Sequence, residues 1–216
     1  MPGIQVDTHI DMIRQSMIKT AHHEAGHAAI NAFFGENHTH FEEITIIPGQ
    51  CFVGTFTQSR VFDLIISRQH GWIKIAGLLA GRLAGKRFDD DFWAITEILE
   101  NGWESDTLVE TESEWRKTVD EGKALTIAEE ISTRGWPALR ILEMVEGWTE
   151  NLLENIHVWN VVETLAKRLL DAGSITDFEE YEAIVKPILY KWPEHPAWKR
   201  RLRIKVYPSV EKQDTE

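Results

Sequence analysis

Two histidines four residues apart, with a glutamate directly after the first, stand in the stretch HHEAGH at residues 22–27. On an α-helix, residues four apart lie one turn above each other, so the imidazoles of His23 and His27 would point the same way. That geometry lets two ring nitrogens bind one Zn²⁺ ion at about 2.0–2.1 Å. Glu24 would lie at the edge of the same face, where its carboxylate can take a proton from a water that the metal activates. The stretch therefore predicts a metal site with hydrolytic chemistry.

The motif continues as HAAINAFF, so it lacks the third histidine that some zinc proteases carry on the same helix. In the extended pattern HExxHxxGxxH, Ile30 and Phe33 stand where a glycine and a histidine are needed. The third ligand must therefore come from another part of the chain. Gly26 lies inside the motif, where a helical glycine costs about 1 kcal/mol relative to alanine. We expect Gly26 to permit a close approach, by the neighbouring hairpin or by a substrate backbone.

Three further histidines stand near the motif, and none of them is expected to bind the metal. His22 lies on the flank of the helix and is expected to be a surface histidine. His38 and His40 lie in a loop before a strand. The alternative for the whole motif is chance occurrence in a chain with nine histidines, in which case the chain is a structural helical domain.

The elements that must position these residues are mostly helices, because few prolines interrupt the middle of the chain. The segments FEEITII and CFVGTF, on either side of Pro48-Gly49-Gln50, predict a β-hairpin over about residues 41–57. The fold class is therefore predicted to be mainly α with a small β-hairpin. Helices are expected over residues 8–34, 61–85, 105–119, 124–133, 137–172 with Gly173 as its stop, and 177–186.

Two stripes of small residues predict how the first two helices pack. Gly77, Gly81 and Gly85 recur at four-residue spacing on the second helix. A smooth glycine stripe lets another helix approach closely, and the natural partner is the stripe on the first helix. The members of that stripe are Ile18, Ala21, Ala25, Ala29 and Ala32.

The composition excludes several classes of protein. A net charge of −12 argues against nucleic acid and against an anionic membrane surface as partners. The single cysteine, Cys51, excludes an internal disulfide framework and fits a reducing compartment. The most apolar run, IKIAGLLAGRLAG, is interrupted by Lys74 and Arg82 and is too short to span a bilayer. With no signal peptide at the N-terminus, we expect a soluble cytoplasmic protein without a membrane anchor.

Five blocks of sequence, in the same order over about residues 16–185, are similar to one known family. TAHHEAGHAAI resembles its AYHEAGHA helix, and ITIIPGQCFVGTF resembles its VTIIPRG-LG-T hairpin. AGLLAGRLAG matches a glycine-rich helix that usually reads GGRAAEE, and GWESDTLVE falls where the family has G-A-S-N-D-L. NVVETLAKRLLDAGSITDFEE resembles its C-terminal helices. The family is the peptidase domain of FtsH-type ATP-dependent zinc metalloproteases.

The resemblance implies a helical zincin-type peptidase domain that binds one zinc ion and hydrolyses peptide bonds. Carried over to the matching positions, it makes His23 and His27 zinc ligands and Glu24 the general base. It also makes Asp106 the third zinc ligand. A carboxylate near the start of a helix, where the helix dipole favours negative charge, is the alternative explanation of Asp106.

Other acidic residues stay open as the third ligand, namely Glu97, Glu100 and Glu104. The chain also departs from the family pattern, because Gly85 and Lys86 stand where the family has a glutamate pair. If that pair supports the zinc site, the support must be built from other residues here.

The expected organisation is a peptidase domain at residues 1–190 and a basic, proline-containing C-terminal tail at residues 191–216. No G-x-x-x-x-G-K-[ST] phosphate loop occurs in the chain, although family members carry an ATPase module and a membrane anchor. We expect a stand-alone, ATP-independent peptidase that acts on unfolded or flexible polypeptides, with a homo-oligomer or a separate ATPase partner left open. The alternative is a non-catalytic, zinc-stabilised module that binds peptides or regulates. Glu24 favours the enzyme, because zinc binding does not require it.

Overall fold

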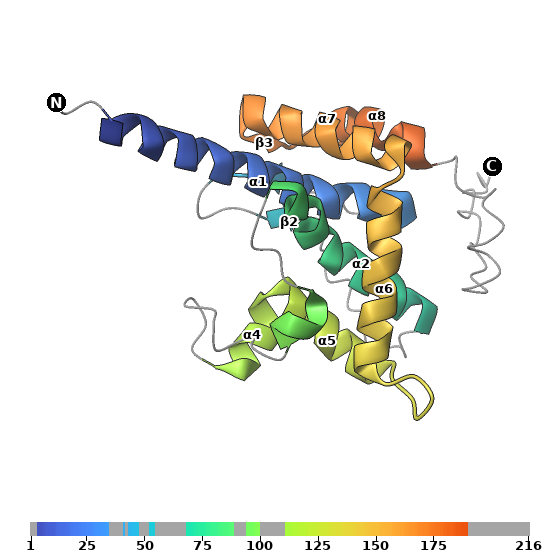
Figure 1. The fold of residues 1–216 in the computed structure, drawn as a ribbon. Helices are drawn as coiled ribbons and strands as arrows, with labels where there is room; N and C mark the ends of the chain where they lie inside the picture. The colour runs from blue at the N-terminus through green and yellow to red at the C-terminus, as the bar shows by residue number, and fades with distance from the viewer. Residues whose placement is uncertain are drawn as a thin grey trace, which may run out of the picture.

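The computed structural model describes residues 4–34, 41, 43–47, 52–54, 68–88, 94–99 and 111–189. These residues form a mainly helical fold with a small antiparallel sheet (Figure 1), which confirms the predicted fold class. The elements are α1 (Ile4–Phe34), β1 (Glu43–Thr45), β2 (Phe52–Gly54), α2 (Arg68–Gly85), the 3₁₀ helix η2 (Lys86–Phe88), α4 (Glu112–Thr118), α5 (Asp120–Glu130), α6 (Ala138–Leu153), α7 (Ile156–Ala172), β3 (Ser174–Ile175) and α8 (Phe178–Leu189).

Several residues named from the sequence lie outside the described part of the chain. They are His38, His40, Glu100, Glu104, Asp106 and the tail at residues 191–216. The predictions made for them therefore stay predictions.

The close packing of α1 against α2 forms the centre of the fold. Alanines of α1 are fully or almost fully buried, as the small-residue stripes predicted, whereas Ile18 at the start of the stripe is half-buried. A Cβ on Gly26 would lie 2.6 Å from both the carbonyl oxygen of Ala80 and the Cβ of Ala84. The segment that approaches Gly26 is therefore α2, and the expectation of the hairpin or a substrate backbone at this position was wrong.

Several helix boundaries differ from the predicted ones, and two of these differences concern the arrangement around the site. The stretch expected as one helix over residues 137–172 is two helices, α6 and α7. The side chain of Asn155 accepts a hydrogen bond from the backbone N–H of His157 (3.0 Å) and caps the start of α7. The other difference is that α5 begins at Asp120, four residues before the predicted start at 124. Two acidic residues, Asp120 and Glu121, therefore form its first turn.

The predicted hairpin is present, and a third strand that was not predicted extends it. Ile44 of β1 pairs with Val53 of β2 on one side and with Ile175 of β3 on the other. Gly173, with φ of 82°, ends α7 where the sequence predicted a stop, and its carbonyl accepts a hydrogen bond from the N–H of Ile46 (2.9 Å). The left-handed turn at Gly173 thus brings the end of α7 to the edge of the hairpin.

The C-terminal helix α8 is fastened to α1 beside the histidine motif. The buried Tyr181 donates a hydrogen bond from its hydroxyl to the carbonyl of Ala28, at 3.0 Å. Its ring stacks on Phe41, with the ring centroids 4.5 Å apart. Since Ala28 directly follows His27, this bond holds the second half of the motif from the side opposite to α2.

None of the helices in the described part of the chain combines the length and the apolar character needed to cross a bilayer. The apolar run IKIAGLLAGRLAG forms most of α2, where its small and aliphatic residues face α1 and the core.

Substitution of Gly26 by alanine should destabilise the fold, because its Cβ has no room against Ala80 and Ala84. Overpacking of a tight core costs roughly 1–3 kcal/mol, so the free energy of unfolding in urea should fall by about that amount. The matched control is Gly85→Ala, whose Cβ would meet only Lys19 Cγ at 3.7 Å. This variant should keep the stability or raise it by up to about 1 kcal/mol. Equal effects of the two substitutions would contradict the described α1–α2 contact.

Candidate metal centre

His27 is held in a fixed orientation by α2. Its side chain is buried, and its Nδ1 lies 2.7 Å from the carbonyl oxygen of Gly77. A carbonyl oxygen can only accept a hydrogen bond, so Nδ1 carries the hydrogen and donates it. This arrangement directs Nε2 away from Gly77 towards His23 and Asp120. Metal-binding histidines typically donate their other ring N–H to a carbonyl or a carboxylate in this way.

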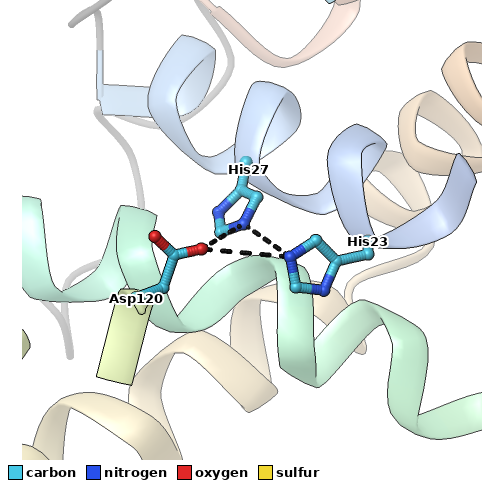
Figure 2. A group of neighbouring side chains, drawn as sticks. All are labelled: His23, His27 and Asp120. Atoms are coloured by element: carbon cyan, nitrogen blue, oxygen red, sulfur yellow. Dashed lines mark hydrogen bonds and ion pairs between the residues drawn. The ribbon is translucent and has the colours of Figure 1, made fainter. Parts of the chain in front are cut away.

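Three side chains converge at this point, as Figure 2 shows. Nε2 of His27 lies 3.0 Å from Nε2 of His23 and 3.1 Å from Oδ2 of Asp120. The separation between Nε2 of His23 and Oδ2 of Asp120 is 3.9 Å. The two histidines come from consecutive turns of α1, and Asp120 is the first residue of α5.

The three side chains form a group that can hold a metal ion. In a tetrahedral site with ligands about 2.1 Å from the ion, the ligand atoms lie roughly 3.4 Å from one another. The three separations measured here, 3.0, 3.1 and 3.9 Å, lie on both sides of that value. His23 and Asp120 are also partly open to solvent, with 35% and 26% of their side chains exposed, so an ion can reach the group.

The glycine at position 81 provides the space for both imidazoles. A Cβ there would lie 2.7 Å from Nε2 of His23 and in hard contact with Nε2 of His27. The glycine stripe of α2 therefore serves two purposes. At Gly77 it leaves room for the side chain of Asn31 of α1, and at Gly81 it leaves a hollow in which the ligand atoms meet.

The charges of the group already favour a cation between His27 and Asp120. Burial lowers the pKa of His27, but the hydrogen bond to the Asp120 carboxylate and the negative charge of that carboxylate outweigh this and raise it to about 9. Burial by itself raises the pKa of Asp120, and the hydrogen bond and charge of His27 reverse the direction and lower it. The pKa of His23 falls to about 3, because of burial and the nearby charge of His27. In this geometry a proton on Nε2 of His27 takes the place of a cation, and a metal ion must displace it.

Glu24 lies next to these ligands with its side chain buried. Burial raises the pKa of its carboxyl group to about 7, and His27 and Asp120 act on it electrostatically in opposite directions. It is therefore a carboxyl group within the electrostatic reach of the metal centre, but it is not one of the three groups whose atoms converge.

The carboxylate found in the group is Asp120, which the sequence analysis did not single out. Asp106 lies outside the described residues, so its assignment as the third ligand stays a prediction. Of the alternatives, Glu97 accepts a hydrogen bond from the N–H of Ala94 (2.7 Å) and does not belong to the convergent group among the described residues. The signal for Asp120 was present in DEGKALTIAEE, because an aspartate followed by glutamate is typical of the first turn of a helix.

His22 is not the surface histidine that was expected. It is half-buried, its ring lies 4.1 Å from that of Phe88 and 6.0 Å from that of Trp159, and its Nδ1 donates to the carbonyl of Ile18 at 2.8 Å. Burial lowers its pKa. Among the described residues, the group that can hold a metal ion contains the other two histidines of the motif and not His22.

Comparison of the chain with models of known protein families gives no match, and no curated protein sequence matches it either. The resemblance to the FtsH-type peptidase domain therefore depends on the sequence motifs quoted above.

Asp120→Asn should weaken metal binding strongly, because it removes the only carboxylate of the described group. The loss should exceed the roughly 10–100-fold that removal of an outer hydrogen-bond partner produces. The affinity is measured by competition with a chromophoric chelator, on the full chain. Asp106→Asn is the companion variant, because the resemblance implies that Asp106 is the third ligand. The reverse result, with a loss for Asp106→Asn alone, would assign the third ligand to Asp106 as the resemblance implies.

Gly81→Ala should lower the metal affinity on the order of tenfold or more, because the new methyl group displaces the imidazoles of His23 and His27 from the ligand positions. Gly85→Ala, one turn later on the same helix, is the control and should bind metal like the wild type. Circular dichroism checks that both variants are folded. Unchanged affinity in a folded Gly81→Ala variant would show that the imidazoles do not meet over this glycine.

Proposed function

We propose that this chain is a zinc-dependent peptidase that hydrolyses peptide bonds in unfolded or flexible polypeptides without ATP. The observation that carries the proposal is the convergence of His23, His27 and Asp120 at separations suited to one metal ion, with the buried Glu24 directly beside the first ligand. A site that only stabilises the fold does not need such a carboxyl group.

The donor set suits zinc. Two imidazole nitrogens and one carboxylate oxygen are the protein ligands of many catalytic zinc sites, in which a fourth position stays open for water or substrate. Structural zinc sites are instead closed by four protein ligands, usually with cysteines. The one cysteine of the chain, Cys51, lies outside the described residues.

Zinc in this position would polarise the carbonyl of the scissile bond and lower the pKa of a water molecule. The residues of the chain would do the remaining work. Glu24 would accept the proton of the attacking water and deliver it to the amine that leaves. Its burial keeps the carboxylate away from bulk solvent, where a hydrogen bond to water would compete. Gly77 would keep Nδ1 of His27 occupied, so that Nε2 remains directed at the centre.

The resemblance to the FtsH-type peptidase domain supports the same reaction. His23, Glu24 and His27 occupy the positions of the motif that supplies two ligands and the base in that family. The hairpin and the glycine-rich helix that the resemblance implies are both present among the described residues, as β1 with β2 and as α2. These features support the proposal, and the activity itself needs an assay.

The sheet limits how a peptide substrate would be held. An extended peptide commonly binds by adding a strand to a sheet edge. In the described sheet, β1 lies between β2 and β3 and is paired on both sides. A substrate strand would therefore add to β2 or to β3. Either position requires an extended segment, which a folded domain presents only after it opens, and opening of core elements costs up to the full stability of roughly 5–15 kcal/mol.

Glu24→Gln should abolish hydrolysis and leave the metal content unchanged, because a glutamine has nearly the same shape and cannot accept the proton. General bases contribute typically 10²–10⁴-fold to a rate, and the loss in kcat should lie in about this range. The measurement combines zinc analysis of the purified full chain with cleavage of a fluorogenic unfolded polypeptide. A Glu24→Gln variant as active as the wild type would exclude Glu24 as the base.

The preference for unfolded chains is tested with one substrate protein in two forms, a stable fold and a permanently unfolded variant. Without ATP, the unfolded form should be cleaved and the folded form should not. Equal rates for the two forms would contradict the proposal. Bound zinc without cleavage of either form would favour a non-catalytic module that binds peptides or regulates.

A further inference from the structure

We propose that Arg82 is a positioning residue for the metal centre. It holds Glu121, and through Glu121 it fixes the first turn of α5, which carries Asp120. The inference rests on the metal-binding part of the proposed function and does not require that the chain cleaves peptides.

Arg82 connects three helices through two carboxylates. Its Nε lies 3.3 Å from Oε1 of Glu121 in α5, and its Nη2 donates to Oε1 of Glu146 in α6. The same oxygen of Glu146 accepts the backbone N–H of Ile95, at 3.2 Å. Arg82 itself belongs to α2, so α2, α5 and α6 meet at one guanidinium group, and Glu146 links this group to the short helical segment at 95–99.

The three charged side chains are well shielded from water. Only 11% of the Arg82 side chain is exposed, compared with 14% for Glu121 and 15% for Glu146. Buried charges of this kind must stay paired, because removal of one partner leaves an uncompensated charge in a poorly solvated place. The planar guanidinium can serve both carboxylates at once, which an ammonium group does less well. The ion pair therefore couples the position of Glu121 to that of Arg82 through charge, because Nε of Arg82 makes no hydrogen bond within the described part of the chain.

The tie acts on the metal centre because neighbouring residues lie at both of its ends. On α2, Arg82 follows Gly81, over which the two imidazoles meet. On α5, Glu121 follows Asp120, the carboxylate of the metal group. Two adjacent residues of α2 therefore act on the metal group from one side. Gly81 faces the histidines, and Arg82 pairs with Glu121, the neighbour of Asp120.

The first turn of α5 needs such a tie. Its N-cap residue is Val119, whose side chain makes no capping hydrogen bond. The other oxygen of Asp120, Oδ1, pairs with Lys123 of the same helix at 3.1 Å, and this pair moves together with α5. The contact between Arg82 and Glu121 is different, because it fixes the turn relative to α2 and hence relative to the site of the histidines.

A second ion pair, which begins directly after α2 in η2, provides a matched control. Lys86, one turn after Arg82, pairs with Glu150 of α6 at 2.6 Å. It joins η2, the continuation of α2, to α6, but it does not involve α5, and both of its side chains are more than 40% exposed. If Arg82 acted only by joining α2 to α6, then Lys86→Gln should lower the metal affinity in the same way as Arg82→Gln, but less.

The experiment measures the affinity for Zn²⁺ by competition titration, and the visible absorption of the Co²⁺-loaded protein, for Arg82→Gln, Arg82→Lys, Glu121→Gln and Lys86→Gln. We expect a loss of roughly 10–100-fold in affinity for Arg82→Gln and for Glu121→Gln, the range found for outer partners of metal ligands. Both should also change the Co²⁺ spectrum, since Asp120 shifts relative to the imidazoles. Arg82→Lys should restore part of the affinity, and Lys86→Gln should match the wild type.

The same titration in an Asp120→Asn background separates positioning from general stability. There, Arg82→Gln should cause no further loss, because the ligand through which it acts is gone. An equal loss of affinity in both backgrounds would overturn the proposal. Wild-type affinity and spectrum in a folded Glu121→Gln variant would also overturn it. Because glutamine keeps the size of the side chain, this second test stands even if Arg82→Gln does not fold. Absence of peptide cleavage, with these shifts in affinity present, would refute the peptidase and leave the positioning role standing. A wild-type chain that binds no metal would overturn both.

Discussion

The distance between α1 and α2 is the constraint on which the rest of the structure depends. The two helices approach so closely that a methyl group on Gly26 would collide with the backbone of the other helix. Only this separation lets Gly77 offer its carbonyl to His27 and lets both imidazoles fit above Gly81. Larger residues at Gly26, Gly77 or Gly81 would move the helices apart, and the ligand atoms would lose their common point. The small residues thus determine the geometry of the centre as well as the packing.

Around this helix pair, the fold places charged groups where charge is otherwise unfavourable. Largely buried side chains carry these groups, namely those of His27, Glu24 and Arg82. Each of them interacts electrostatically with a titratable side chain close by. A cluster of this kind is a weak source of stability, since desolvation offsets much of the attraction. Its arrangement is better explained by what it can bind. Buried polar groups held by backbone carbonyls and by a guanidinium keep their orientation before any ligand arrives, which reduces the cost of binding one.

The helical motif, the hairpin and the small-residue stripes could be predicted because each depends on residues near one another in the chain. The spacing of His23 and His27 determines a shared face once the segment is helical, and the stop at Gly173 follows from the left-handed conformation that glycine tolerates. The carboxylate of the group could not be predicted in this way. Which acidic residue reaches the histidines depends on how α5 packs against α2, and neither spacing nor charge reveals that contact. The break at Asn155 was also missed, because it depends on a side-chain cap, the acceptance of the His157 N–H by Asn155, and on the packing of α7 against α1.

The ligands of the centre belong to helices that are far apart in the sequence, with α1 at one side and α5 at the other of a long intervening stretch. In the unfolded chain the three side chains do not converge, so an ion that binds all three of them stabilises the folded state. At a free metal concentration one hundred times the dissociation constant, such selective binding adds about 2.7 kcal/mol to the free energy of unfolding. That gain is comparable to a substantial part of the stability of an ordinary domain. The same ion that would serve catalysis would therefore also act as a clamp between distant segments, and metal supply would influence how long the chain survives as well as how fast it works.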